Sequence, residues 1–267
     1  MKLRPIAGIV LRQIYLMRGS PVRLFPMVTW VAIDIVLWGF ITRYLNTVSG
    51  AGVDFVPTLL GGVLLWDFCT RIMQGVTTAF LEDVWSRNFL NLFSSPLSIS
   101  EYISGLVITS VATSSIGVVA MLLLATGIFH LQFFSMGLPL IGFLAVLFVF
   151  GISLGIFGSA VVLRFGPASE WLLWPLPALL SPFAAVFYPL AVLPQWMQGV
   201  ARALPPAYVF EGMRMLLAGH PFPGVLLLQG SLVAALELLL AAYFYGRVYG
   251  HAVRTGLLAR YSAESVA

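Results

Sequence analysis

Charged residues are scarce in this sequence of 267 residues. Only 9% of the residues are charged, whereas 60% are hydrophobic. A water-soluble domain carries about 25% charged residues because its surface must face water. Fourteen basic and ten acidic residues are too few to cover a soluble protein of this size. The composition therefore excludes a soluble globular protein and predicts that most of the surface faces hydrocarbon.

Lysine, cysteine and histidine are also scarce, which limits the catalytic and metal-binding sites that the chain could form. Lys2 is the only lysine, so the chain lacks the internal lysine of a phosphate-binding loop and cannot hydrolyse ATP through one. Cys69 is the only cysteine, which leaves no internal disulfide, and the three histidines lie far apart. We therefore expect no catalytic residue, metal site or cofactor in this chain. The formal charge of +4 comes almost entirely from arginines that flank apolar segments, which indicates membrane orientation rather than nucleic-acid binding.

Six apolar runs are candidates for membrane spans, since a bilayer core takes about 20 apolar residues as helix. The runs are Pro26–Ile41, Phe55–Phe80, Tyr102–Phe129, Leu138–Leu163, Trp171–Leu193 and Val225–Tyr249. Helices are expected because lipid cannot satisfy the polar groups of the backbone. The predicted fold class is an all-α integral membrane protein whose six transmembrane helices occupy residues 26–249.

The segments outside the spans predict an orientation. Residues 1–25 read as an interfacial helix, because apolar residues recur at helical spacing from Leu3 to Ser20 with arginines elsewhere on the wheel. Residues 250–267 form a short tail. With the N-terminus inside, the cytoplasmic segments hold ten basic residues and the external segments only Arg43, Arg202 and Arg214. Both termini are therefore predicted to be cytoplasmic.

Residues 81–100 form an amphipathic cytoplasmic segment between the second and third runs. One helical face carries Leu81, Trp85, Phe89 and Leu92. The opposite face carries Glu82, Asp83, Ser86, Arg87 and Asn91. Pro96 is expected to end the helix. The segment is either a solvated connection or a helix that docks into a groove of a cytoplasmic partner, and its large aromatic residues favour docking.

The fifth run is rich in proline, which predicts a kinked or broken helix. The prolines are Pro175, Pro177, Pro182, Pro189 and Pro194. The residues that follow, 194–224, are too polar to span a membrane and too apolar for a free loop. We expect two short re-entrant or interfacial helices there on the external side, over residues 195–203 and 207–218. Trp196 and Tyr208 are predicted to anchor them at the membrane interface, and Glu211 is predicted to pair with Arg214.

Ionisable residues inside the runs are candidates for function, because charge in hydrocarbon is costly. Asp67 and Arg71 lie one helical turn apart and are expected to neutralise one another. Asp34 and Glu237 have no partner in sequence. They could face an aqueous cavity, pair across helices or lie closer to the membrane interface.

Small residues predict close helix packing at two places. Gly151, Gly155 and Ser159 recur at every fourth position of the fourth run. The third run carries a hydroxyl-bearing band of Thr109, Ser110, Thr113, Ser114 and Gly117. This band serves either helix packing or the lining of a translocation path.

Taken together, these features resemble the membrane subunit, or permease, of ABC-2 type transporters that export drugs or lipid-linked saccharides. The resemblance covers essentially the whole chain. It rests on the N-terminal interfacial helix, the six runs, and the element S-P-x-S-x-x-E formed by Ser95, Pro96, Ser98 and Glu101. It also rests on residues 181–214, which contain S-P, Y-P and L-P-x-W elements and end in E-x-x-R. Pro205-Pro206 stands where the family usually has asparagine-proline.

The resemblance implies an exporter subunit, not itself an enzyme, in a bacterial inner membrane. Such subunits work as dimers, expected here to be a homodimer, with two separate ATPase subunits that bind ATP and Mg²⁺. It implies that residues 81–93 are the coupling helix, and that residues 3–20 are a connecting helix beside it. The residues assigned to coupling are Glu82, Asp83, Trp85, Arg87, Phe89, Leu92 and Pro96. The residues assigned to the path or its gate are Asp34, Phe183, Phe187 and Tyr188.

The implied cargo is an amphipathic or lipid-linked molecule, and membrane lipids are expected as further partners. Two other functions remain open from the sequence. An ion-coupled secondary transporter could use the intramembrane carboxylates Asp34, Asp67 and Glu237. An intramembrane enzyme acting on lipid-linked substrates is the weaker alternative, because no histidine, metal or nucleophile constellation can be assembled.

Overall fold

The chain folds into helices in a computed structural model that describes residues 3–19, 25–49, 56–86, 88–129 and 137–257. Within these ranges there is no strand. Three of the described helices are long and apolar enough to cross a membrane: α5 (Ile99–Phe129), α6 (Leu138–Phe165) and α11 (Gly224–Arg254). The predicted helical fold is confirmed for the described residues, and these three helices fit the predicted membrane character.

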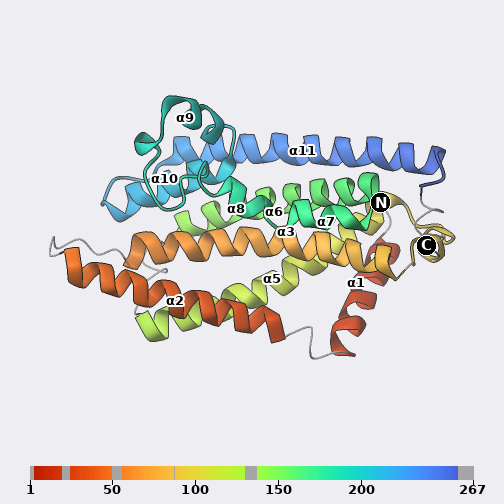
Figure 1. Cartoon of the computed structure of the whole chain (residues 1–267), viewed down its shortest axis with the longest axis horizontal. Coiled ribbons are helices and arrows are strands. Elements are labelled where there is room, and N and C mark those ends of the chain that lie inside the picture. Colours follow the sequence, from red (N-terminus) through yellow and green to blue (C-terminus); the bar gives the residue numbers. More distant parts are fainter. Residues whose placement is uncertain (1–2, 20–24, 50–55, 87, 130–136, 258–267) are drawn as a thin grey trace.

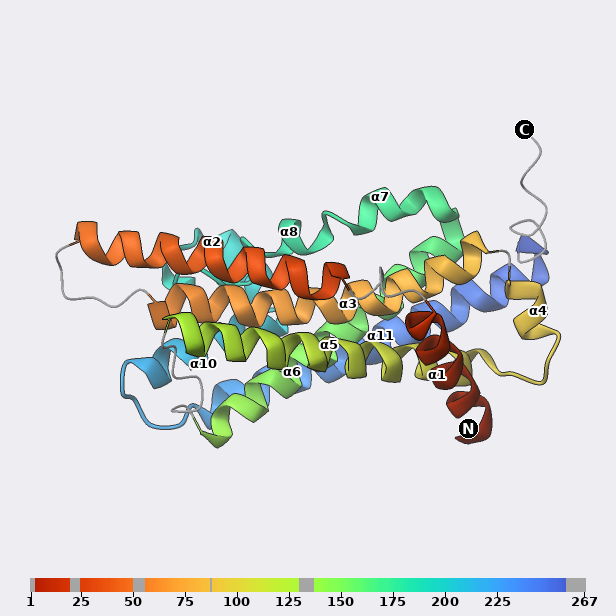
Figure 2. The ribbon, with the colours of Figure 1, turned by 90° about the horizontal axis from the view of Figure 1, so that it is seen from below.

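The long helices lie roughly along one axis, with α3 (Gly61–Trp85) at the centre (Figures 1 and 2). Helix α3 packs between α5 and α6, and α6 packs in turn against α11. Helix α2 (Phe25–Ser49) lies beside α5 and joins α3 through the π-helical turn η2 (Val56–Leu60). Both α2 and α3 run further than the first two predicted apolar runs, because no helix breaker follows those runs directly.

Glycines allow α6 to approach α3 closely. A Cβ atom on Gly151 would lie 2.7 Å from the carbonyl oxygen of Cys69, and one on Gly155 would lie 2.7 Å from the Cβ of Val76. Ser159 is fully buried and its hydroxyl donates to the Gly155 carbonyl over 2.9 Å. The close packing predicted for this small-residue run is confirmed.

Helix α1 (Leu3–Arg18) lies across one end of the bundle, against α5 (Figures 1 and 2). Its buried residues are Ile6, Ile9 and Gln13. A Cβ atom on Gly105 of α5 would lie 2.6 Å from the Cβ of Ile9, so glycine is needed for this contact. The short helix α4 (Phe89–Phe93) and the last turn of α11 lie at the same end (Figure 2), which is called the α1 end below.

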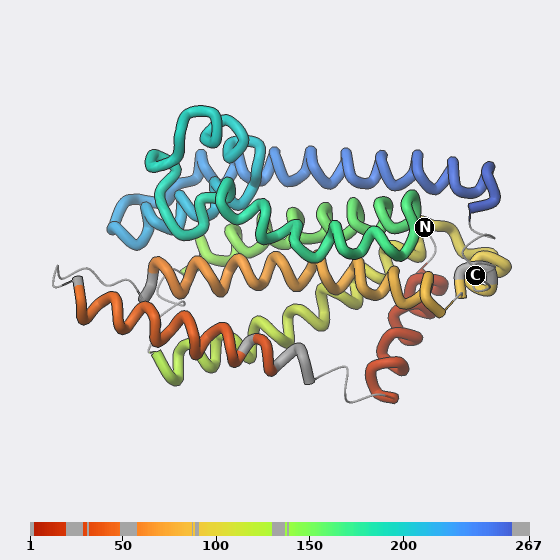
Figure 3. The backbone as a smooth tube through the Cα atoms, viewed as in Figure 1, coloured from red at the N-terminus to blue at the C-terminus, as the bar shows by residue number. Residues whose placement is uncertain are grey.

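The fifth apolar run is broken, as its prolines predict. It follows the 3-10 turn η4 (Pro167–Ser169) and consists of the single-turn helices α7 (Glu170–Leu173) and α8 (Leu176–Leu180), an irregular stretch, and the turn η5 (Leu190–Val192). Figure 3 shows this irregular path beside the regular coils of the long helices. Ala185 has a φ of 54°, a left-handed conformation that is costly for a residue with a side chain.

Two short helices follow, close to the predicted ranges. They are α9 (Gln195–Ala201) and α10 (Pro205–Leu217). They lie at the opposite end of the bundle from α1, called the α10 end below (Figure 1). Prolines occupy the first two positions of α10, where their missing N–H groups cost nothing.

Candidate functional site

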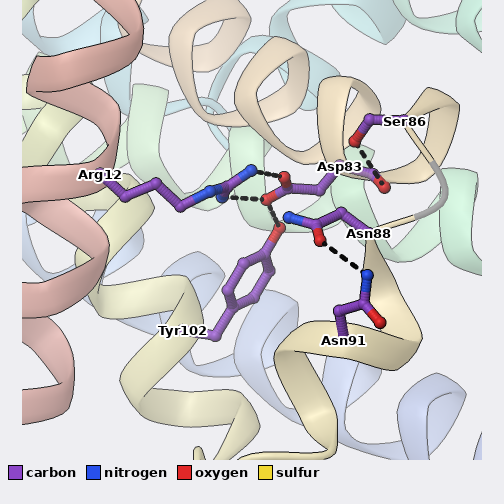
Figure 4. A network of polar contacts seen from close by, with 6 residues as sticks. All are labelled: Arg12, Asp83, Ser86, Asn88, Asn91 and Tyr102. Carbon is purple, nitrogen blue, oxygen red and sulfur yellow. Dashed lines mark hydrogen bonds and ion pairs between the residues drawn. The ribbon is translucent and has the colours of Figure 1, made fainter.

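A partly buried ion pair connects α1 to the end of α3 (Figure 4). Arg12 Nη1 donates to Asp83 Oδ2 over 2.9 Å, and Arg12 Nη2 donates to Asp83 Oδ1. The hydroxyl of Tyr102, on α5, donates to Asp83 Oδ2 over 2.7 Å. The Asp83 side chain is fully buried, whereas that of Arg12 is 27% exposed. The hydrogen bond to Asp83 raises the pKa of Arg12 above its ordinary value, against the opposing effect of burial.

This junction of Arg12, Asp83 and Tyr102 fixes three helices at one point. A bidentate arginine–carboxylate pair is both strong and directional, so α1 cannot shift relative to α3 without breaking it. Sequence reasoning missed Arg12 and Tyr102 as functional residues. Arg12 lies 71 residues from Asp83, so no helical spacing could relate them, and Tyr102 reads as part of an apolar run.

The predicted coupling helix differs from the structure in extent and in orientation. Helix α3 continues to Trp85, and the separate helix α4 covers only Phe89–Phe93. Asp83, which the sequence places on the polar face of the predicted amphipathic helix, is fully buried, where Arg12 of α1 neutralises its carboxylate. Leu81 is buried in the core, and Glu82 is half-buried. Arg87 and the side chain of Phe89 lie outside the described residues.

The loop around α4 exposes a different surface from the predicted one. Phe93 packs against Tyr102 and Tyr249, with ring centroids 5.6 and 5.8 Å apart, so it is held against α5 and α11. Leu92 is half-buried, whereas Trp85 is 52% exposed and Pro96 is exposed. Among the side chains of this segment that the structure describes, Trp85 is therefore the large aromatic one that a partner could contact.

The S-P-x-S-x-x-E element forms the N-terminal cap of α5. The backbone N–H of Ser98 donates to Glu101 Oε2 over 3.1 Å, and the N–H of Glu101 donates to Ser98 Oγ over 3.3 Å. This reciprocal pair is a capping box, which satisfies two donors at the helix start. Pro96 precedes it and ends the loop. The element thus fixes where α5 begins, directly beside the junction.

A partly open cavity of about 610 Å³, lined by both polar and apolar groups, lies among α1, α2, α3 and α5. One face of α3 lines it with residues spaced three and four apart, and α5 lines it with the hydroxyl-bearing band. The described lining residues are Gln13, Met17, Trp30, Asp34, Asp67, Thr70, Arg71, Gln74, Gly75, Thr78, Ala79, Glu82, Thr109, Ser110, Thr113, Ser114, Gly117 and Trp174. The polar periodicity of α3 from Asp67 to Glu82 is the sequence signal that could have revealed this cavity.

The charges that the sequence analysis placed inside the apolar runs occupy different environments. Arg71 Nε donates to Asp67 Oδ2 over 2.6 Å, which confirms the predicted pair. Asp34 faces the same cavity as this pair. Glu237 lies on α11, and its Oε2 is buried without a hydrogen-bond partner in the described part of the chain. The structure therefore brings Asp34, Asp67 and Arg71 together and leaves Glu237 apart from them.

At the α10 end, Glu211 and Arg214 pair over 2.9 Å, as predicted. Both also bind the backbone of the broken fifth segment. Glu211 Oε1 accepts from the N–H of Leu190 over 2.6 Å, and Arg214 Nη2 donates to the carbonyl of Ala185 over 2.6 Å. These side chains supply hydrogen bonds that a continuous helix would make within its own backbone.

The aromatic residues predicted to form a gate lie in the broken segment. Phe187 stacks on Trp38 of α2 with ring centroids 5.6 Å apart, and Phe183 packs against Trp196 at 6.1 Å. The hydroxyl of Tyr188 donates to the Pro182 carbonyl over 2.6 Å. None of these gate residues is among the described residues that line the cavity, although Phe187 contacts Trp38, one helical turn after Asp34 on α2. Tyr208 donates its hydroxyl to the Arg202 carbonyl over 2.7 Å.

Comparison with known proteins adds no relative: no protein-family model matches the chain, and no curated protein matches it. Functional interpretation therefore rests on the two sites described above. One is the junction with the α4 loop at the α1 end. The other is the cavity among α1, α2, α3 and α5.

Proposed function

We propose that this chain is the membrane-spanning permease subunit of an ATP-driven exporter of the ABC-2 type. The observation that carries the proposal is the buried junction of Arg12, Asp83 and Tyr102. It makes one mechanical unit of the interfacial helix, the end of α3 and the start of α5. A unit of this kind suits a subunit that receives motion from a cytoplasmic partner.

The exposed α4 loop is the proposed contact with that partner. Trp85 is half-exposed beside the junction, and Pro96 is exposed where the loop returns to α5. A large aromatic side chain buried in a partner's pocket is a common anchor of interfaces. Force applied at Trp85 passes to Asp83 two residues away, and through its ion pair to α1. The coupling surface is thus smaller than the sequence-based helix and centred on Trp85.

The proposal includes the assembly that the sequence resemblance implies. Two ATPase subunits bind ATP with Mg²⁺ and close, and two copies of this chain, spanning a bacterial inner membrane six times each with cytoplasmic termini, open outward. The chain itself is not the enzyme. Nucleotide can shift such an equilibrium only through its different affinities for the two states, which reside in the ATPases. The capping box at Ser98 and Glu101 supports the proposal by fixing the far side of the loop.

The test compares Trp85→Asp with Gly199→Asp. Both add one carboxylate to an exposed site, at opposite ends of the bundle, and a Cβ atom on Gly199 meets nothing within 4 Å. The tagged full-length chain is purified from membranes, and the ATPase activity that copurifies with it is measured. We expect Trp85→Asp to reduce this activity by at least about tenfold, as loss of an anchoring aromatic does. Gly199→Asp should leave it unchanged, at equal amounts of membrane-inserted protein.

Two results would contradict the proposal. One is that no ATPase copurifies with the wild-type chain from its native membranes. The other is that the Trp85→Asp variant copurifies with as much ATPase as the Gly199→Asp variant.

A second candidate, an ion-coupled transporter, is favoured by one observation. Glu237 Oε2 is buried without a hydrogen-bond partner among the described residues, and intramembrane carboxylates of this kind are typical of ion pathways. Transport by the isolated chain in vesicles without nucleotide, abolished by an uncoupler, would support this candidate. Loss of that transport in Glu237→Gln would assign the residue, whereas dependence on nucleotide would reject the candidate.

A further inference from the structure

We propose that the cavity among α1, α2, α3 and α5 binds a cationic amphipathic molecule, with the positive group of the ligand held at Asp34. This inference deepens the proposed function, on which it rests, by assigning a substrate class to the exporter. The volume of about 610 Å³ lies within the range of about 300–1,000 Å³ that is typical of sites for small molecules. Along α3 the lining extends from Asp67 to Glu82, a rise of about 22 Å, which suits an elongated ligand.

The charge of the lining selects a cation. The described lining holds three carboxylates, Asp34, Asp67 and Glu82, and a single guanidinium, that of Arg71. Arg71 is bound to Asp67 over 2.6 Å, so it offers little to an anionic ligand. The formal charge of the lining is therefore negative after this pair is counted as neutral. Such a site attracts a positive group and repels a negative one.

Asp34 is the carboxylate best placed to receive the cation. Asp67 is occupied by Arg71, and Glu82 lies at the α1 end of the cavity. Asp34 has neither an ion pair nor a hydrogen bond in the part of the chain that the structure describes. A carboxylate at membrane depth is costly without a partner, and a bound cation would offset this cost.

The aromatic and hydroxyl groups around Asp34 favour the same ligand. Trp30 lies one helical turn before Asp34 on α2, and Trp174 also lines the cavity; they are 61% and 49% exposed. Indole faces attract cations and also hold apolar groups. These two side chains could therefore contact both the positive group and the apolar group of an amphipathic cation.

Three of the hydroxyls that line the cavity donate their hydrogen to a carbonyl of their own helix, which leaves them as acceptors. Thr109 donates to the Gly105 carbonyl over 2.9 Å, Thr113 to the Thr109 carbonyl over 3.0 Å, and Thr70 to the Trp66 carbonyl over 3.0 Å. Each hydroxyl has one hydrogen to donate, so what remains for a ligand is its lone pairs. A surface of lone pairs complements ammonium N–H groups and positive charge.

Gln13 gives an independent sign that a ligand occupies the cavity. Its side chain is only 5% exposed and lines the cavity from α1. Its Nε2 has no hydrogen-bond partner within the described ranges. A buried amide donor without an acceptor is unfavourable, and an oxygen acceptor at the far end of an elongated cation would satisfy it.

The test measures binding of tetraphenylphosphonium by equilibrium dialysis to the full-length chain purified in detergent, with empty micelles as the blank. Tetraphenylborate, which has nearly the same size and the opposite charge, is the matched probe. We expect saturable binding of the cation alone. Asp34→Asn should weaken it by at least about tenfold, because the charge pair between the carboxylate and the cation is lost. Glu237→Gln, which removes an intramembrane carboxylate outside the cavity, should leave it unchanged.

Trp30 supplies a second, independent variant. Trp30→Leu keeps an apolar side chain but removes the aromatic face, and should weaken binding about threefold, whereas Trp30→Phe should weaken it less. If Asp34→Asn does not fold, this pair decides the question. Equal binding of the two probes, or unchanged binding in Asp34→Asn or Trp30→Leu, overturns the assignment.

The dialysis uses neither nucleotide nor ATPase, so its outcome is separate from that of the copurification test. If the chain binds both probes equally but still copurifies with an ATPase, the proposed substrate class is rejected and the proposed permease function is retained. Selective cation binding by a chain that brings down no ATPase would retain the site and reject the permease.

Discussion

The two ends of the bundle use charged side chains in contrasting ways. At the α1 end, Arg12 and Asp83 join two separate helices, and the carboxylate is fully buried. At the α10 end, Glu211 and Arg214 lie three residues apart on one helix and are 27% and 13% exposed. Their other partners are the backbone groups of Leu190 and Ala185 in the broken segment.

This difference separates two structural roles of a charge pair. The first pair holds one helix to another, so a displacement of α3 is transmitted to α1. The second pair replaces backbone hydrogen bonds that prolines have removed, so it stabilises the local path of one segment. The first is therefore expected to affect the stability of the whole bundle and its coupling, and the second mainly the protection of residues 185–193.

The largest effect is predicted for Asp83→Asn. This change leaves the Arg12 guanidinium facing an amide, at a site where breaking a buried pair costs about 3 kcal/mol. The free energy of unfolding, measured by titration from mild detergent into sodium dodecyl sulfate, should fall by about that amount. The double variant Arg12→Met with Asp83→Asn should lose less than the sum of the two single variants, because no charge is then left unpaired. Additive losses would show that the two residues do not interact.

Arg214→Met is predicted to have the next largest effect. The variant removes hydrogen bonds to the carbonyls of Ala185 and Val186 and the ion pair with Glu211, a loss of about 2 kcal/mol. Limited proteolysis should show faster cleavage within residues 185–193, while cleavage near the α1 end stays unchanged. Arg202→Met, the same substitution on an exposed arginine next to α9, should change neither. Identical cleavage patterns for the two variants would contradict the assigned role of Arg214.

The contrast between the ends also explains what could be predicted from the sequence. Glu211–Arg214 and Asp67–Arg71 are neighbours on one helix face, so their spacing was sufficient to pair them. The break in the fifth run followed from Pro175 and Pro177, and the approach of α6 to α3 from Gly151. Each of these features is determined by residues close together in the chain.

Features that depend on distant contacts were not predictable in this way. Asp83 lies on the polar side of a helical wheel, yet it is buried because α1, some seventy residues earlier, covers it. The wheel also treated residues 81–93 as one helix, although α3 ends at Trp85. The cavity needs polar faces from α2, α3 and α5 to converge, and the spacing within each helix does not specify that convergence.

The smallest effect is predicted for Ser98→Ala, and it tests whether the loop element serves as a cap or as a binding surface. Loss of the Ser98 side-chain acceptor should cost about 1 kcal/mol, whereas Ser98→Thr should retain most of it. Hydrogen exchange should increase in the first turn of α5. Ser94→Ala, whose hydroxyl bonds only the Asn91 carbonyl in an exposed loop, should not have this effect.

A residue of the helix cap and a residue of the docking surface should affect stability and copurified ATPase in opposite ways when they are replaced. If Ser98 serves α5, Ser98→Ala lowers stability and leaves the copurified ATPase nearly unchanged. Trp85→Asp should do the reverse, because its side chain is half-exposed and adds little to the core. A strong loss of ATPase in Ser98→Ala would instead make the cap part of the docking surface. The α1 end would then transmit motion through the start of α5 as well as through the ion pair to α1.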